Sequence, residues 1–192
     1  MTHPAILILI IGTSSSGKTT FARKLQAGLG GYWQYMGLDS TFAGVPPAYG
    51  GGHEGVLNRE GFHYQDKATN ARIVFGPIGE RVLHGMIQGA VAMVNAGVPV
   101  LFDDMLLNER HAAMWRAVLQ EVPHLVIRLT AADATLQVRN QSRANPPNLS
   151  LNHIAANTLL QADFTFDTSH GDPAADIDRV RERISALRKQ QG

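Results

Sequence analysis

The sequence predicts an α/β protein in which one parallel sheet lies between two layers of helices. Short apolar runs alternate along the chain with longer amphipathic segments, an order typical of strands that are joined by helices. The first run, residues 5–11, is apolar at every position, as expected for a central strand that is buried on both faces. The length of 192 residues fits a single domain over residues 1–192.

The predicted elements follow one another in a regular order. Strands are expected at residues 5–11, 32–38, 98–102, 124–129 and 163–167. Helices are expected at residues 18–29, 77–96, 109–120, 132–144 and 152–160, and Asp172-Pro173 is expected to begin a last amphipathic helix.

One segment, residues 40–75, departs from this alternation. It contains Pro46-Pro47 and Gly50-Gly51-Gly52, and only residues 62–64 suggest a short strand. A long stretch without periodicity inside a compact domain is usually functional or disordered.

Composition excludes several classes of function. The formal net charge is +1, so a broad basic surface for nucleic acid is not expected. Cysteine is absent, which excludes disulfides, a thiolate nucleophile and a cysteine zinc site and agrees with a cytoplasmic location. Residues 1–4 lack a basic leader, residues 5–11 are too short to span a membrane, and the eight histidines show no metal-ligand spacing. We therefore expect neither nucleic acid nor membrane as a partner, while the sequence leaves the oligomeric state open.

The strongest motif follows the first strand. Residues 12–19 match G-x-x-x-x-G-K-[S/T], the P-loop, whose backbone N–H groups surround phosphate oxygens at the start of a helix. Lys18 is expected to reach the β- and γ-phosphates of ATP, and the Thr19 hydroxyl to bind Mg²⁺. The predicted nucleotide-binding residues are Gly12, Thr13, Ser14, Ser15, Ser16, Gly17, Lys18, Thr19 and Thr20.

Acidic residues stand at the ends of two further predicted strands. Ligands of open α/β sheets bind at the carboxyl edge of the strands, so Asp103 and Asp104 are candidates to hold Mg²⁺; alternatively, one of them caps the helix that begins near Asn108. Asp39 ends the strand at 32–38. It can serve as the general base that takes a proton from an attacking hydroxyl, or it can cap the loop that begins at Ser40.

Two arginines mark a candidate lid over residues 132–147. Arg139 and Arg143 are four residues apart and share one face of the predicted polar helix. They can close over the phosphates and neutralise charge in the transition state, or they can belong to a solvated surface helix. Asn145-Pro146-Pro147-Asn148 forms a stiff end to this lid.

The segment 40–75 is the candidate acceptor site. Its apolar and aromatic side chains suit an acceptor with an apolar or aromatic part, although the same residues can simply pack the loop onto the domain. They are Phe42, Val45, Pro46, Pro47, Tyr49, Phe62, Tyr64 and Phe75.

The order of these motifs resembles the chloramphenicol phosphotransferase family. The matching segments run over nearly the whole chain: the P-loop, Gly37-Leu38-Asp39-Ser40, Gly76-Pro77, Phe102-Asp103-Asp104, Trp115-Arg116 and Asp167-Thr168-Ser169-His170. The resemblance implies a three-layer P-loop kinase fold with a five-stranded parallel sheet, ATP with Mg²⁺, and transfer to a hydroxyl of an amphenicol or a similar acceptor. It also implies that Asp39 is the catalytic aspartate and that Arg139 and Arg143 are lid arginines.

The chain departs from the family pattern at two places. Ala144-Asn145 follows Arg143 where a further arginine is expected, and Asn157-Thr158-Leu159 stands where a histidine is expected. The sequence therefore predicts an ATP-dependent kinase for a small hydroxyl compound, with chloramphenicol as one candidate acceptor. The alternatives are a P-loop kinase for another metabolite and a nucleotide-binding module without an acceptor; the guanine-binding motif Asn-Lys-x-Asp is absent.

Overall fold

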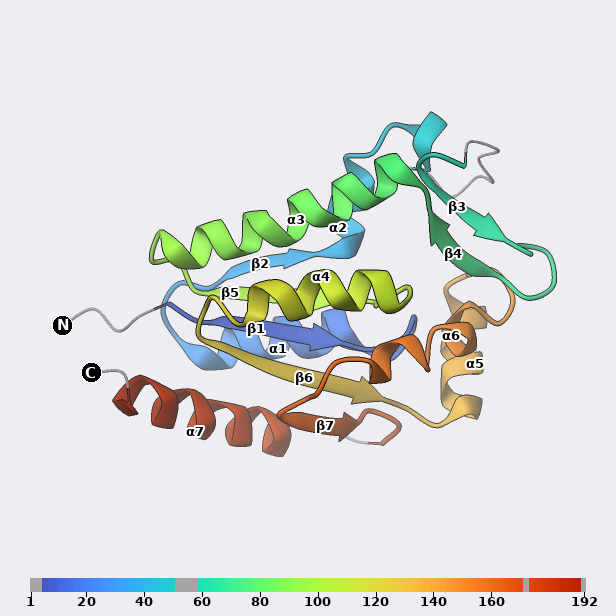
Figure 1. The fold of residues 1–192 in the computed structure, drawn as a ribbon. Coiled ribbons are helices and arrows are strands. Elements are labelled where there is room, and N and C mark those ends of the chain that lie inside the picture. Colours follow the sequence, from blue (N-terminus) through green and yellow to red (C-terminus); the bar gives the residue numbers. More distant parts are fainter. Residues whose placement is uncertain (1–4, 51–58, 171–172, 191–192) are drawn as a thin grey trace.

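A computed structural model describes residues 5–50, 59–170 and 173–190. Five parallel strands form the central sheet in the order β2-β5-β1-β6-β7 (Figure 1). Their bounds are β1 Leu7–Ile11, β2 Gln34–Gly37, β5 Val100–Asp104, β6 His124–Thr130 and β7 Phe164–Asp167. The predicted α/β class and five-stranded parallel sheet are confirmed.

Helices cover both faces of the sheet because β1 is apolar on both sides. Leu7, Leu9 and Ile11 pack toward α3 (Pro77–Asn95) and α4 (Glu109–Leu119). Ile8 and Ile10 pack toward α1 (Lys18–Leu29) and α7 (Ala174–Gln190). All of these strand side chains are fully buried, so the sheet has a core on each face.

The second predicted strand is shorter than expected, and this changes the place of Asp39. Strand β2 ends at Gly37, and a short helix, α2, spans Leu38–Ala43. Asp39 therefore lies in the first turn of α2, not at the end of a strand. It remains at the carboxyl edge of the sheet because α2 begins directly after β2.

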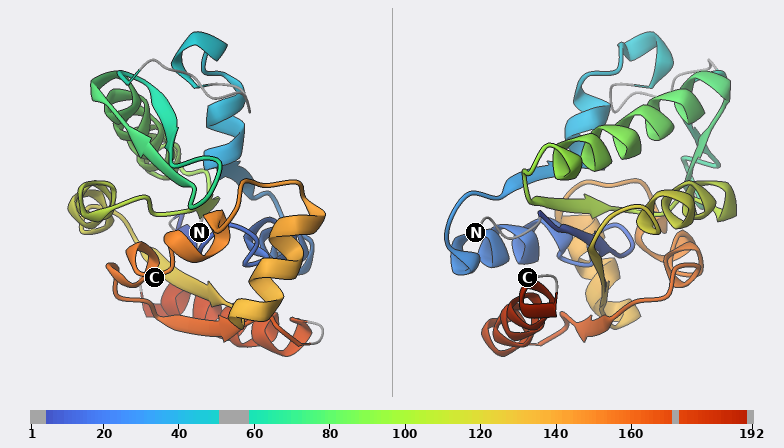
Figure 2. Two further views of the ribbon diagram at one scale, coloured as in Figure 1. Left: turned by 90° about the vertical axis from the view of Figure 1, so that its right-hand side faces the viewer. Right: turned by 60° about the vertical axis from the view of Figure 1, so that its left-hand side comes forward.

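The segment 40–75 has more regular structure than its sequence indicates. A 3₁₀ turn at Pro47–Tyr49 precedes an antiparallel hairpin of β3, Phe62–Gln65, and β4, Arg72–Phe75. The hairpin stands beside the start of α3 and away from the main sheet (Figure 2). Glycines 51 and 52 lie outside the described residues, as do residues 1–4 and the expected cap Asp172.

Two helices after β6 also differ from expectation. The helix predicted as a lid, α5, is Asp133–Ser142, so Arg143 stands just beyond its last turn. The single helix expected at residues 152–160 is instead a short helix α6, Leu149–Asn152, followed by a 3₁₀ turn at Ala156–Thr158. The two pieces turn the chain back toward β7.

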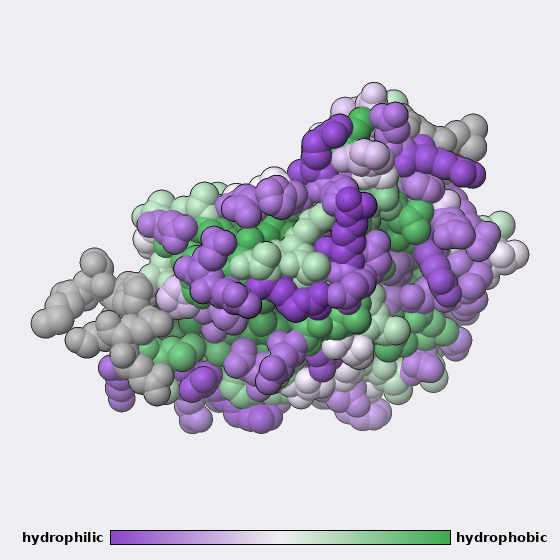
Figure 3. Space-filling view, viewed as in Figure 1, coloured by the Kyte–Doolittle hydropathy of each residue, from purple (hydrophilic) through white to green (hydrophobic). Residues whose placement is uncertain are grey.

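Within the described ranges, none of the helices combines the length and apolar character that a bilayer crossing needs. Hydrophilic and apolar side chains are interspersed on the face formed by α3 and α4 (Figure 3).

Candidate functional site

The P-loop joins β1 to α1 in a conformation that only small residues permit. Gly17 and Ser15 have left-handed backbone angles, with φ of 89° and 64°. A Cβ on Gly12 would lie 2.5 Å from Ser16 Oγ and 2.7 Å from the Leu129 carbonyl oxygen. No side chain caps the N-terminus of α1, so its first N–H groups stay available for an anion.

Lys18 lies at the centre of the charged groups around this loop. Its Nζ donates to the Thr13 carbonyl oxygen at 2.9 Å, and the side chain is half-buried. Burial lowers the pKa of Lys18, and the carboxylates of Asp103 and Asp39 oppose that shift. The lysine is therefore placed where a phosphate would compensate its charge.

Asp103 and Asp104 point to opposite faces of the sheet because consecutive strand residues alternate. Asp103 is buried against α1, where its Oδ2 accepts hydrogen bonds from Thr19 Oγ1 at 2.9 Å and Tyr35 Oη at 2.6 Å. Burial raises the pKa of Asp103, while the Tyr35 hydroxyl and Lys18 oppose the shift. Thr19 and Asp103 thus present two hard oxygen groups side by side, a combination that suits Mg²⁺.

Asp104 does not join this group. Its Oδ2 accepts from the indole Nε1 of Trp115 at 2.5 Å and lies 3.0 Å from His111 Nε2, inside the core below α4. The expected alternative, a helix cap, is made by Asn108, whose Oδ1 accepts from His111 N at 3.0 Å. Of the two aspartates, only Asp103 faces the P-loop.

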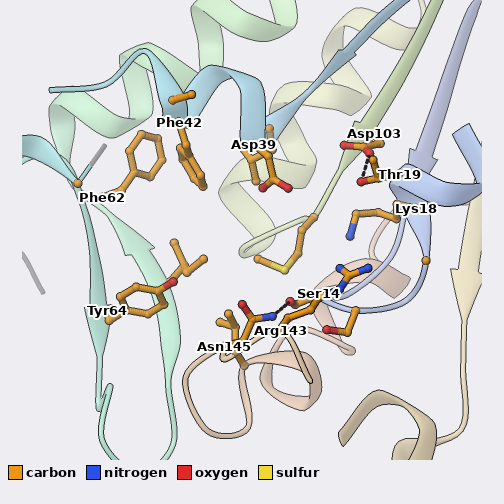
Figure 4. A pocket seen from close by; sticks show the side chains of 18 of the residues that line it. Ser14, Lys18, Thr19, Asp39, Phe42, Phe62, Tyr64, Asp103, Arg143 and Asn145 are labelled. Carbon is orange, nitrogen blue, oxygen red and sulfur yellow. Dashed lines mark hydrogen bonds between the residues drawn. The ribbon is translucent and has the colours of Figure 1, made fainter. Parts of the chain in front are cut away.

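A cavity of about 480 Å³ brings most of the predicted site residues together (Figure 4). One end is formed by the P-loop residues Ser14, Ser15, Gly17, Lys18 and Thr19 with Asp103. The other end is largely apolar, and it is lined by Leu38, Phe42, Ala43, Phe62, Ile73, Met105 and Leu149 with His63 and Tyr64. Its volume is that of a typical small-molecule site.

Asp39 lies between the two ends of the cavity. In Figure 4 its carboxylate points into the space that separates Phe42 from Lys18. The N-cap position of α2 is Gly37, which has no side chain to cap the helix. Its charge adds to the effect of burial in raising the pKa of Tyr64, on the opposite wall.

The aromatic residues of the segment 40–75 pack against one another, and several of them also line the cavity. Phe42 packs against Phe62 with ring centroids 4.4 Å apart, and Phe62 in turn lies 6.4 Å from Phe75. Phe42, Phe62 and Tyr64 also line the cavity. The same side chains hold the hairpin onto α2 and form the apolar wall of the site.

The predicted lid helix α5 contacts the P-loop through Arg139. Arg139 donates through Nη2 to the Thr168 carbonyl oxygen at 2.6 Å and through Nη1 to Thr168 Oγ1 at 3.0 Å. Its Nη1 also lies 3.4 Å from the Ser15 carbonyl oxygen. Arg143 is exposed and lines the main cavity, where Asn145 Nδ2 donates to Ser14 Oγ at 3.3 Å. Hydrogen bonds from α5 and from the residues that follow it therefore connect this region to the P-loop.

A second cavity of about 240 Å³ adjoins the other side of the P-loop. Both cavities are lined by Gly17 and Arg143, and the second is also lined by Thr20 and Arg139. The remaining lining residues are Phe21, Lys24, Phe166, Asp167, Thr168, His170, Pro173 and Asp176. This space is continuous with the loop that would hold phosphates, so it suits the base and ribose of a nucleotide.

Sequence reasoning missed three parts of the site. Thr168 and His170 were noticed only within a family motif, although they follow β7 at the carboxyl edge where ligands are expected. Asn145 was noticed only as the stiff end of the lid. Tyr35 was missed entirely, because nothing local indicates that its hydroxyl meets Asp103 on another strand.

Comparison with known proteins identifies the family. A profile described as chloramphenicol phosphotransferase-like protein matches residues 5–185. No curated protein matches the chain.

Solved structures of several kinases share the fold at low sequence identity. A sugar kinase from Janibacter sp., solved without ligand, is 19% identical with a TM-score of 0.62, over 96% of this chain and 98% of that one. The APS kinase of Mycobacterium tuberculosis, in complex with AMPPNP and APS, is 15% identical with a TM-score of 0.60, over 96% and 97%. Shikimate kinase from Acinetobacter baumannii, in complex with shikimate, is 15% identical with a TM-score of 0.57, over 96% and 95%. Since the family profile also extends from β1 into α7, the chain belongs to the chloramphenicol phosphotransferase-like family and has the fold of P-loop kinases.

Proposed function

We propose that this chain transfers the γ-phosphate of ATP to a hydroxyl of a small molecule that has an apolar or aromatic part. The observation that carries the proposal is the main cavity, which has the P-loop at one end, an apolar wall at the other, and Asp39 between them. A donor and an acceptor bound at these two ends would meet beside a carboxylate. A nucleotide-binding module without an acceptor would not need that wall.

Each part of the cavity has a role in the proposed reaction. Lys18 and the N–H groups at the start of α1 would hold the phosphates, and the second cavity would hold the nucleoside. Asp39 would accept the proton of the acceptor hydroxyl. At the same time the hydroxyl oxygen would bond to the γ-phosphorus, and the bond between that phosphorus and the bridging oxygen of the leaving ADP would break. Arg143, exposed at the edge of both cavities, would stabilise the charge on the moving phosphoryl group.

A divalent metal fits the oxygen groups beside Lys18. Thr19 Oγ1 and Asp103 Oδ2 are 2.9 Å apart, and no cluster of three or more His, Asp or Glu side chains that could hold a metal occurs in the described ranges. Such a sparse set of protein ligands is typical of Mg²⁺ that is held jointly with phosphates. When bound there, Mg²⁺ would neutralise charge on the phosphate oxygens.

The acceptor is proposed from the family and from the cavity wall. The family name makes chloramphenicol and related amphenicols the first compounds to test. Nucleosides, shikimate-like metabolites and other hydroxyl-bearing antibiotics complete the panel. The mainly apolar wall favours acceptors that bury a ring or an alkyl group over highly charged ones.

The first experiment is a transfer assay with ATP, Mg²⁺ and this panel, on the wild type and Asp39→Asn. The asparagine keeps the shape of the side chain but cannot take up the proton, so kcat should fall about 10²–10⁴-fold. Nucleotide affinity, measured by calorimetry, should change little because the P-loop is intact. Asp178→Asn on α7, which lines neither cavity, is the matched control and should keep wild-type rates.

Each part of the proposal has an outcome that contradicts it. Normal transfer by Asp39→Asn would remove the base role, and a parallel loss of nucleotide affinity would place Asp39 near the metal instead. Absence of ATP binding by the wild type would overturn the kinase proposal. Binding of ATP without transfer to any member of the panel would favour the non-catalytic module.

A further inference from the structure

The carboxylate of Asp103 is held from two sides by neighbouring elements. Its Oδ2 accepts from Thr19 Oγ1 on α1 at 2.9 Å and from Tyr35 Oη on β2 at 2.6 Å. The Thr19 hydroxyl uses its proton in this bond, so its oxygen lone pairs stay free for a metal ion. Tyr35 supplies the second donor to Oδ2.

Strand β2 also leaves room for the other oxygen of this carboxylate. Gly37 lies opposite Asp103 in the parallel register, and a Cβ on Gly37 would come within 2.4 Å of Asp103 Oδ1. Any other residue at this position would push the carboxylate away. Tyr35 therefore holds one oxygen of the carboxylate, and Gly37 on the same strand leaves room for the other.

The position of the Tyr35 ring is itself fixed. The ring packs against the core cluster on the α1 face, and the Arg23 guanidinium carbon lies 4.0 Å from its centroid. The residue lines neither of the two cavities described above. Its hydroxyl donates to Asp103 and also interacts with the Thr19 side chain, so it reaches the proposed metal site through these two residues.

We infer that Tyr35 is a positioning residue, which orients the Asp103 carboxylate so that Thr19 and Asp103 together hold the metal ion of the bound nucleotide. This inference rests on the proposed function, because it requires a metal–nucleotide complex on the P-loop. Groups that orient metal-binding side chains commonly contribute 10–100-fold to metal affinity, so the effect is measurable.

The experiment measures how much Mg²⁺ strengthens nucleotide binding, without any turnover. AMPPNP is titrated into the protein by calorimetry, once with EDTA and once with saturating Mg²⁺, and the ratio of the two Kd values is the contribution of the metal. Tyr35→Phe keeps the ring and its packing but loses the hydroxyl. We expect the ratio to shrink about 10-fold, with the Kd in EDTA unchanged.

Two controls separate positioning from a general structural effect. Tyr32→Phe removes a tyrosine hydroxyl that donates to Gln34 Oε1 at the surface, and it should leave the ratio at the wild-type value. In Asp103→Asn the ratio should already be reduced, and adding Tyr35→Phe to it should change nothing further.

The possible outcomes are distinct. An unchanged ratio in Tyr35→Phe, or an equal loss of affinity with EDTA and with Mg²⁺, would overturn the role of Tyr35 and leave the proposed function intact. Additive losses in the double variant would show that Tyr35 does not act through Asp103. Absence of AMPPNP binding by the wild type under both conditions would overturn the proposed function together with this inference.

Discussion

Gly12 shows how a missing side chain shapes the phosphate-binding loop. A Cβ at this position would overlap Ser16 Oγ at 2.5 Å and the Leu129 carbonyl oxygen at 2.7 Å. The carbonyl belongs to the backbone of β6 and cannot turn aside, so an added methyl group must displace the loop itself. The glycine is required for close approach of the loop to the sheet, not for an unusual φ angle.

We expect Gly12→Ala to lose nucleotide binding and to destabilise the fold by about 1–3 kcal/mol, the usual cost of forcing an extra methyl group into a packed site. Nucleotide titration and urea unfolding measure the two effects. Gly85→Ala is the matched control, since a Cβ on this exposed glycine of α3 meets nothing within 4 Å. It should stabilise the helix by up to about 1 kcal/mol. Normal nucleotide affinity in Gly12→Ala would contradict the role given to this close contact.

At the scale of elements, the two arginines of the predicted lid differ. Arg139 is hydrogen-bonded to neighbouring elements, whereas Arg143 is exposed. The guanidinium of Arg139 donates hydrogen bonds to Thr168 and to the Ser15 carbonyl oxygen. These bonds connect α5 to the P-loop and to the end of β7. Arg143 follows the last turn of the helix, and it lines both cavities. The surface-helix alternative therefore describes Arg139 poorly.

Both Arg→Ala changes should lower kcat more than they weaken nucleotide binding, and Arg143→Ala should have the larger effect on kcat. Loss of a group that stabilises developing charge costs about 10²–10³-fold in kcat. Arg139 is already hydrogen-bonded to Thr168 and Ser15, so its replacement should mainly weaken the contact between α5 and the P-loop. Steady-state kinetics with calorimetric nucleotide affinities test the difference, with Arg181→Ala on α7 as the control. Wild-type activity in both lid variants would return α5 to a solvated surface helix.

At the scale of the whole molecule, the region after α5 connects to the β3–β4 hairpin through hydrogen bonds. The Ala71 N–H donates to the Pro147 carbonyl oxygen at 2.9 Å, and Asn152 Nδ2 donates to the Ala71 carbonyl oxygen at 2.9 Å. His153 is buried beside them, where its Nε2 accepts from the Ile73 N–H at 3.1 Å. Burial lowers the pKa of His153 from 6.5 to about 4.

This histidine makes stability depend on pH. Between pH 6.5 and about 4 the unfolded chain binds a proton at residue 153 that the folded protein does not, so the free energy of unfolding decreases as the pH falls through this window. The largest contribution of one such shift is about 3 kcal/mol. His153→Gln keeps an acceptor for the Ile73 N–H but does not titrate.

Urea unfolding at pH 7 and at pH 4.5 tests this prediction. The difference between the two free energies of unfolding should be smaller in His153→Gln than in the wild type. His84→Gln, at an exposed position on α3, controls for the loss of a histidine elsewhere. An identical pH dependence in His153→Gln and the wild type would show that His153 is not the group that titrates.

The sequence by itself determined the parts of this protein that depend on short-range patterns. The apolar run before Gly12, the P-loop, and the start of α1 at Lys18 are all encoded within about twenty consecutive residues, and the structure has them as predicted. The strands of the central sheet also alternate with helices as their periodicity indicates, because burial on both faces requires continuous apolar runs. The carboxyl edge of the sheet, and hence the neighbourhood of Asp39 and Asp103, followed from this order.

Only the tertiary structure decided which neighbours meet at that edge. Asp103 and Asp104 are equivalent in sequence, but alternation turns one toward α1 and the other toward Trp115, and the face that α1 covers is fixed by the packing of the whole sheet. The pairing of β3 with β4 and the hydrogen bond from Tyr35 to Asp103 join residues that no local pattern relates. Such contacts depend on the free energy of closing long loops around a shared core, a property of the folded chain that no window of the sequence contains.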